Sequence, residues 1–232
     1  MDFNLSNNDS IICFLPCREG SERVKNKNIK QFGESKFGLI EIKINQLLNC
    51  TLISKIVLST NDDSILEYAR KLNNTKILIH KRDNSLCTNL TTTDDLILHA
   101  SDLIKNAHIL WTHVTSPFIS NVDYENMIRT YFDKIKTGYD SLMTVNEIRS
   151  FVWKNNEPIN YKRSEMKWPR TQTLEPLHEI NSGVFLAHSS IYIKNKDRIG
   201  DHPFLYKLDK IRGHDIDWPE DFVLGELINK MK

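Results

Sequence analysis

The chain has 232 residues, a length that suits one α/β domain better than two independent domains. Its 31 basic side chains almost cancel its 30 acidic ones, so the overall charge gives no reason to expect a nucleic-acid partner. No apolar run approaches the roughly 20 residues of a membrane helix, and the polar start lacks the pattern of a signal peptide. We therefore expect a cytoplasmic protein without a membrane partner.

Cysteine and histidine spacings exclude the common structural metal motifs. The four cysteines show no paired CxxC spacing, and the eight histidines contain no HExxH arrangement. Scattered cysteines in a chain of this size make neither a disulfide framework nor a zinc site. We expect reduced and mostly buried thiols at Cys13, Cys17, Cys50 and Cys87.

The first predicted element is an apolar strand over residues 11–15, which runs directly into a basic loop. A strand that ends at Pro16 delivers this loop to the carboxyl edge of a sheet, where open α/β folds bind ligands. The loop lacks the GxxxxGK[ST] of a P-loop and the GxGxxG of a dinucleotide site, so a plain solvated loop is the alternative. Two features favour phosphate binding. Gly20 and Ser21 let the backbone approach a ligand, and cations follow at Arg23, Lys25 and Lys27.

Strands and helices then alternate along the chain. Short β-branched runs predict strands, and apolar residues at helical spacing predict helices between them. Such alternation is typical of βαβ units in a mainly parallel sheet with helices on both faces. Strands are expected at residues 55–60, 77–80, 108–114 and 141–145, and helices at residues 37–48, 62–72, 92–104 and 124–135.

The alternation breaks at residues 146–176, a polar segment that carries large aromatic side chains. Trp153, Tyr161 and Trp168 lie there among many charged residues. Because large aromatic residues are enriched at protein interfaces, this segment predicts an inserted arm that forms a dimer contact. An ordered loop packed on its own domain is the alternative. The sheet is expected to resume at residues 179–187.

An acidic segment, HDIDWPEDF, leads into the last predicted helix at residues 217–231. Asp215 and Asp217 stand two residues apart, so in extended backbone their carboxylates project to the same side and can share a divalent cation. In the alternative, Asp217 only caps the helix and Glu220 completes a capping box. The inward face of the helix is expected to contain Phe222, Val223, Leu224, Leu227 and Ile228.

These segments resemble, in order, the motifs of the acylneuraminate cytidylyltransferases, the family that includes the CMP-sialic acid synthetases. LPCREGSERVKNKN is similar to the family's PARxGSKxxxxKN signature, and HVTSPFIS is similar to its QPTSPLR block. WPRTQTLEPLHEINSGVFLA resembles its RxQ…NGxxY segment, and HDIDWPEDF resembles its DIDTPEDF element. The resemblance covers essentially the whole chain. It implies a Rossmann-like nucleotide-diphospho-sugar transferase fold, formed as a single domain over residues 1–232 with residues 146–176 as its arm.

The resemblance also implies a reaction and roles for individual residues. The reaction is transfer of CMP from CTP to a 2-keto-3-deoxy acid sugar of the sialic acid type, with release of pyrophosphate, in a Mg²⁺-dependent homodimer. Asp215 and Asp217 are the expected Mg²⁺ ligands and, with Arg18 and Lys27, the expected catalytic residues. CTP is expected to contact Arg18, Gly20, Ser21, Arg23, Lys27 and Asn28. The sugar is expected to contact Thr92, His113, Arg170 and Gln172.

Three positions depart from the family's pattern. Glu22 replaces the lysine of GSK, His113 replaces the glutamine before PTSP, and Ile119 replaces the arginine after it. Two alternatives therefore stay open: an enzyme of the same chemistry for a Kdo-like or a diamino nonulosonic acid, and a non-catalytic nucleotide-binding or interaction protein on the same fold. The surviving loop cations and paired aspartates favour an enzyme, because a binding module would have little need to keep them together.

Overall fold

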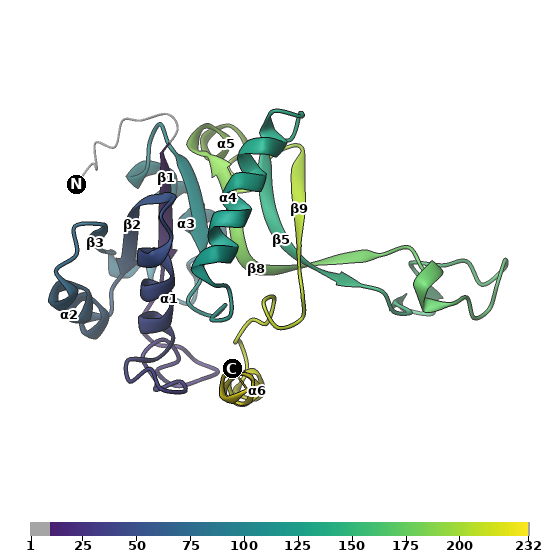
Figure 1. Ribbon diagram of the computed structural model, residues 1–232, viewed down its shortest axis with the longest axis horizontal. Coiled ribbons are helices and arrows are strands. Elements are labelled where there is room, and N and C mark those ends of the chain that lie inside the picture. The colour runs from purple at the N-terminus through teal and green to yellow at the C-terminus, as the bar shows by residue number, and fades with distance from the viewer. Residues whose placement is uncertain (1–9, 232) are drawn as a thin grey trace.

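The computed structural model describes residues 10–231, which form a seven-stranded sheet with helices on both faces (Figure 1). The strand order is β3-β2-β1-β4-β8-β5-β9, and β8 runs antiparallel to both of its neighbours while the other pairs are parallel. The predicted mainly parallel α/β sheet is therefore confirmed, although β9 was not predicted. The strands are β1 (Ile11–Pro16), β2 (Ile53–Thr60), β3 (Ile77–Lys81), β4 (His108–Thr112), β5 (Ser141–Ile148), β8 (Leu177–His188) and β9 (Pro203–Leu208).

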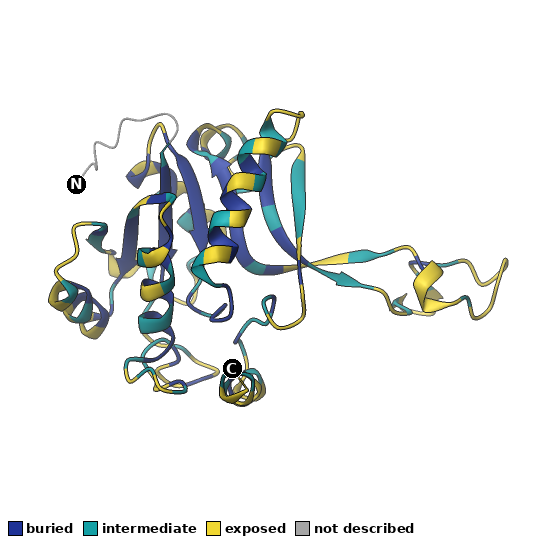
Figure 2. Cartoon of the chain, viewed as in Figure 1, coloured by how far each residue is buried: buried dark blue, intermediate teal, exposed yellow. Residues whose placement is uncertain are grey.

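Side-chain alternation along β1 builds a core on both faces of the sheet. Cys13 and Leu15 face one hydrophobic cluster, and Ile12 and Phe14 face the other. A strand buried on both faces reads as a continuous apolar run, and Figure 2 shows the central strands buried in this way. The first cluster includes residues of α1 (Gly38–Asn49), α2 (Asp63–Leu72) and α4 (Asn121–Ile135), and the second includes residues of α3 (Thr93–Leu103) and the unpredicted α5 (Ser189–Asn195).

Residues 149–176 form an arm that projects away from the body of the molecule (Figure 1). The β5–β8 ladder continues to the pair Ile148 and Leu177, and this two-stranded ribbon carries the arm. The arm contains the short strands β6 (Trp153–Lys154) and β7 (Glu157–Pro158) and a 3₁₀ turn, η2 (Thr171–Thr173). Most of it is exposed to solvent (Figure 2). The dimer contact stays a prediction.

The predicted inward face of the last helix, α6 (Pro219–Lys230), is only partly correct, because Phe222 and Ile228 pack on the core and the other three residues do not. Phe222 packs on Phe32, and a Cβ added at Gly225 would lie 3.0 Å from the Phe32 ring, so this narrow strip is the buried face. Three of the residues expected inside are instead about half exposed: Val223, Leu224 and Leu227. The apolar spacing identified a helix but not the side that packs.

All four cysteines are free thiols, and three of them are buried, as predicted. The fourth, Cys87, is partly exposed. Between residues 10 and 231, no helix is both long enough and apolar enough to cross a membrane.

Candidate active site

Two adjoining cavities open at the carboxyl end of β1, and a third shares a lining residue with one of them. The loop cavity, about 260 Å³, is lined by the basic loop and by residues 113–115. The Arg82 cavity, about 240 Å³, shares Pro16, Arg18 and His113 with it. The acidic cavity, about 650 Å³, lies at the base of the arm and shares Asp217 with the loop cavity. The edge of the sheet predicted to bind a ligand is therefore hollowed.

Two cations of the basic loop converge on Asp217. The buried Lys27 ammonium donates to Asp217 Oδ1 at 3.1 Å and to the Ile216 carbonyl at 2.7 Å. Arg23 Nη1 lies 3.4 Å from Asp217 Oδ2, and its guanidinium lies over the Trp218 ring. The structure thus brings the loop and the acidic segment, predicted separately, into one site.

A left-handed turn at Gly20 and a hydrogen bond within the basic loop define its conformation. Gly20 has a φ of +78°, and a Cβ placed there would meet nothing within 4 Å, so glycine is needed for the left-handed turn and not for close packing. Asn28 donates from Nδ2 to the Arg18 carbonyl at 3.0 Å and fixes the start of the loop to its end. Ser21 and Asn28 both line the loop cavity.

Asn89 bridges Arg18 and Glu22, two residues of opposite charge in the basic loop. Arg18 Nη1 donates to Asn89 Oδ1 at 2.6 Å, and Asn89 Nδ2 donates to the Glu22 carboxylate. The negative charge that departs from the family's pattern is therefore engaged by a neutral amide. Glu22 still lines the loop cavity.

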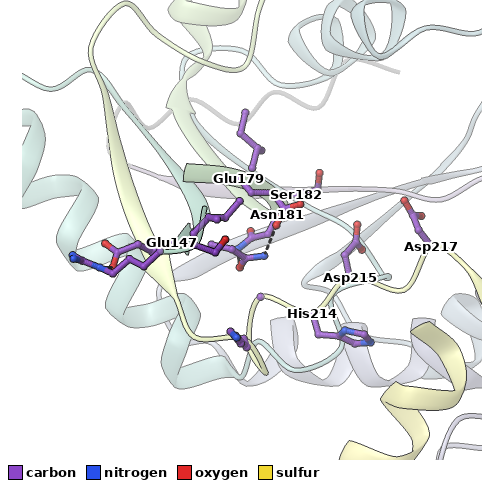
Figure 3. Close-up of a pocket in the computed structure, with 14 residues that line it drawn as sticks. Glu147, Glu179, Asn181, Ser182, His214, Asp215 and Asp217 are labelled. Carbon is purple, nitrogen blue, oxygen red and sulfur yellow. Dashed lines mark hydrogen bonds and ion pairs between the residues drawn. The ribbon is translucent and has the colours of Figure 1, made fainter. Parts of the chain in front are cut away.

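The carboxylates of Asp215 and Asp217 project to the same side of the segment, as the sequence spacing predicted (Figure 3). Ile216 between them is buried, and its N–H donates to the Thr115 carbonyl at 2.8 Å, which fixes the extended backbone. Asp215 Oδ1 is buried and has no hydrogen-bond partner. Burial raises the pKa of Asp215 to about 6, against a lowering by the Thr115 hydroxyl.

A hard divalent cation fits the pair of carboxylates formed by Asp215 and Asp217. An unpartnered buried carboxylate oxygen is an acceptor that a cation would satisfy, and oxygen is the ligand that Mg²⁺ prefers. No cluster of three His, Cys, Asp or Glu side chains among residues 10–231 could hold a metal by itself. The two aspartates therefore suit a cation whose other ligands are substrate oxygens and water, and Mg²⁺ stays a prediction.

The predicted capping role of Asp217 is wrong by one residue. Trp218 occupies the N-cap position of α6, and Asp221, not Glu220, accepts from its backbone N–H at 2.7 Å. Asp221 also accepts from the Asp217 N–H at 3.1 Å. The Asp217 side chain is therefore left for the two loop cations and for a ligand.

Arg82 is a site residue that the sequence analysis missed. It is only 3% exposed, its Nε donates to Cys87 Sγ at 3.1 Å, and its Nη1 is buried without a partner. Arg82 lines the Arg82 cavity, and its guanidinium carries an unsatisfied buried donor that an acceptor would stabilise. The available signal was an arginine placed two residues after the end of the strand predicted at residues 77–80.

A bulge in β8 shapes one wall of the acidic cavity. Ser182 has a φ of +57°, and the β5–β8 register shifts at this point. The buried Asn181 holds the bulge: its Oδ1 accepts from Thr144 Oγ1 at 2.7 Å, and its Nδ2 donates to Asn146 Oδ1 at 2.8 Å (Figure 3). The charged lining side chains that the sequence analysis did not select are Glu147, Arg149, Glu179 and Lys210.

Three of the predicted sugar contacts lie away from the lining of these cavities. Thr92 caps α3 in a reciprocal pair with Asp95. Arg170 and Gln172 are exposed on the arm. Their predicted contacts with the sugar remain untested predictions. Ile119, where the family has arginine, is fully buried in the core.

Comparison with known proteins places this geometry in a family. The model of a cytidylyltransferase family matches residues 12–225. A pseudaminic acid cytidylyltransferase of Campylobacter jejuni is 22% identical over 95% of this chain and 96% of its own length. A CMP-N,N'-diacetyllegionaminic acid synthase of the same species is 24% identical over 96% of each chain. The solved structure of a CMP:2-keto-3-deoxy-manno-octonic acid synthetase complexed with CTP has a TM-score of 0.63 at 13% identity and covers 96% of this chain and 99% of that one. The fold and family expected from the motifs are thereby confirmed, and the chain belongs to the cytidylyltransferase family.

Proposed function

We propose that this chain transfers CMP from CTP to the anomeric hydroxyl of an acidic nonulosonic sugar and releases pyrophosphate. One observation carries the proposal: Asp217 lines both the loop cavity and the acidic cavity. A nucleotide in the first cavity and a sugar in the second would meet over this carboxylate. The two cations that contact it, Arg23 and Lys27, come from the predicted phosphate loop.

The loop cavity supplies the charge that a triphosphate needs. Arg18, Arg23 and Lys27 line it and are placed to donate to phosphate oxygens. Asp215 and Asp217 would hold Mg²⁺, which when bound neutralises charge on the phosphates. Catalysis by these residues rests on positioning and on fixed charges, as is usual where charge develops in the transition state.

The Arg82 cavity is suited to the cytosine ring. Cytosine offers two adjacent acceptors, O2 and N3, whereas uracil replaces the second by an N–H donor. The unpartnered Arg82 Nη1 is a donor only, so next to N3 it favours cytosine, whose N3 accepts, over uracil, whose N3–H donates. Arg18 lines both this cavity and the loop cavity, which lets one nucleotide span them.

The acidic cavity is of a size common for small-ligand sites. Two cationic side chains, Arg149 and Lys210, line this cavity, and Arg149 is already paired with Glu147. Lys210 is therefore our proposed partner for the sugar carboxylate, and Glu179 is placed to accept from a hydroxyl or amide N–H. We propose a pseudaminic or legionaminic type of acid, the substrates named for two relatives, with Kdo as the alternative that the solved synthetase indicates.

A homodimer in the cytoplasm completes the proposal. The arm exposes Trp168 and Met166 by 71% and 58%, an apolar surface that a second copy would cover. A partner's arm could then bring Arg170 and Gln172 to the sugar. Mixing inactive Arg170→Ala and Asp217→Asn chains tests this, because a mixed dimer would keep one complete site. Free thiols suit a reducing compartment.

The test of the function is pyrophosphate release from CTP and Mg²⁺ against pseudaminate, legionaminate, N-acetylneuraminate and Kdo, with ATP, GTP and UTP as nucleotide controls. Release with CTP and one acid establishes the reaction and its sugar. Binding of CTP without turnover on any acid would favour a non-catalytic nucleotide-binding protein. Loss of both CTP binding and turnover would overturn the proposal.

A further inference from the structure

His113 has one ring nitrogen that receives two donors. Trp111 Nε1 donates to His113 Nε2 at 2.9 Å, and Arg198 Nη1 lies 3.4 Å from the same nitrogen. An indole N–H and a guanidinium can only donate. His113 Nε2 must therefore present its lone pair, so a neutral ring carries its proton on Nδ1.

The surroundings of His113 oppose a charged ring. Arg198 stacks at 3.6 Å from the Phe185 centroid and 4.8 Å from the Trp111 ring, which fixes a cation beside the imidazole. Burial is the largest cause that lowers the pKa of His113, to about 3, and Arg198 is the next. Of the other charged groups that act on it, Lys43 and Lys27 lower the pKa and Asp217 raises it. The ring therefore stays neutral across the physiological range.

The location of His113 indicates which substrate it meets. It lines the loop cavity and the Arg82 cavity, and it is not among the residues that line the acidic cavity. Among the residues that the structure describes, Pro16 and Arg18 are the only others that line both of the cavities that it lines. A nucleotide with its base beside Arg82 and its triphosphate in the loop cavity must pass this ring.

We propose that His113 is a nucleotide-binding residue that donates from Nδ1 to an oxygen of the nucleotide, where the nucleoside joins the triphosphate. Trp111 and Arg198 are its positioning residues, because they fix the tautomer. This inference rests on the proposed function. It moves His113 from the sugar, where the resemblance had placed it, to the nucleotide.

The first test needs no turnover and therefore separates this inference from the proposed function. Nitrogen-15 NMR of the free wild-type protein between pH 5 and 8 should show His113 neutral and protonated on Nδ1 throughout. A proton on Nε2, or a ring that titrates in this range, would overturn the inference. Arg198→Met should raise the pKa of His113. An unchanged pKa in a folded variant would remove Arg198 as a positioning residue.

The second test uses variants that differ in donor capacity. His113→Leu should raise the Michaelis constant for CTP about tenfold, the cost of roughly one hydrogen bond, and leave that for the sugar unchanged. His113→Gln keeps an N–H donor and should recover most of the loss. A rise confined to the sugar's constant, or equal losses in the two variants, would contradict the assignment. If no sugar turns over, CTP binding by calorimetry provides the same comparison.

Discussion

Lys27 Nζ lies 3.1 Å from Asp217 Oδ1, although the two residues are 190 positions apart in the chain. The same ammonium holds the carbonyl of Ile216, the residue between the two aspartates. The basic loop and the acidic segment therefore become one site only when the sheet has formed. This contact explains why neither segment alone identifies the chemistry.

Lys27→Met should lower kcat/KM about 100-fold, because it removes a buried donor from Asp217 and, under the proposed function, from the phosphates as well. Lys25→Met is the matched control, since Lys25 is an exposed cation of the same loop. Its kcat/KM should stay within about twofold of wild type, as is usual for surface substitutions. Equal losses in the two variants would show that only the net charge of the loop matters.

Asp217→Asn should reduce Mg²⁺-dependent turnover about 1000-fold, because an amide oxygen is a poorer ligand for a hard cation than a carboxylate. Glu220→Gln is the control, since it removes an exposed carboxylate three residues away. Circular dichroism and thermal unfolding should show both variants folded. Turnover near the wild-type level in Asp217→Asn would refute the metal assignment.

Asp215→Asn should make the protein more stable and less active. Its carboxylate is largely buried with one oxygen unpartnered, so a neutral amide removes a cost of about 1–3 kcal/mol at pH 7. Thermal unfolding without metal should show the gain. Mg²⁺ with CTP should raise the melting temperature of the wild type more than that of the variant. A variant less stable than wild type would contradict this.

Lys43 should make stability depend on pH above neutrality. It is fully buried, donates to the Ser116 carbonyl and the Tyr124 hydroxyl at 2.7 Å each, and burial lowers its pKa from 10.5 to about 7. Between pH 7 and 10.5 the unfolded chain binds the additional proton, so the free energy of unfolding rises with pH through this group. Urea denaturation at pH 7 and 9 should show the rise in wild type and a smaller one in Lys43→Met. An equal change in the free energy of unfolding with pH in the two proteins would refute this role of Lys43.

Arg82→Gln should weaken discrimination between CTP and UTP. The glutamine amide can donate or accept, so it can serve the N–H of uracil as well as the acceptors of cytosine. We expect the ratio of kcat/KM for the two nucleotides to fall about tenfold, mainly through CTP. Thr88→Val is the control on the same cavity wall. An unchanged ratio in Arg82→Gln would remove Arg82 from base recognition.

Local sequence patterns predicted most of the fold because the spacing of apolar residues follows which positions are buried. The apolar run of β1 is buried on both faces, and the helical spacing of α1 and α2 matches their buried residues. The patterns failed where packing is decided by distant residues. The packing face of α6 depends on Phe32, and β9 depends on its pairing with β5.

The candidate site was predictable where residue type and spacing carry the chemistry. Asp215 and Asp217 stand on one side of an extended segment, as their spacing predicted. The burial of Arg82 and the contact of Arg198 with His113, 85 positions away in the chain, arise only when the chain has folded. The position of Arg82 after a strand is a signal, but its burial and the tautomer of His113 are properties of the folded chain.

Phosphorus-31 NMR of a reaction that contains CTP, Mg²⁺ and an acid sugar tests the central claim most directly. CMP transfer predicts that the CTP signals disappear while pyrophosphate and one new phosphodiester signal appear in equal amounts. Asp217→Asn should leave the CTP signals unchanged over the same time. Release of CMP or of inorganic phosphate without a phosphodiester product would show hydrolysis and contradict the account.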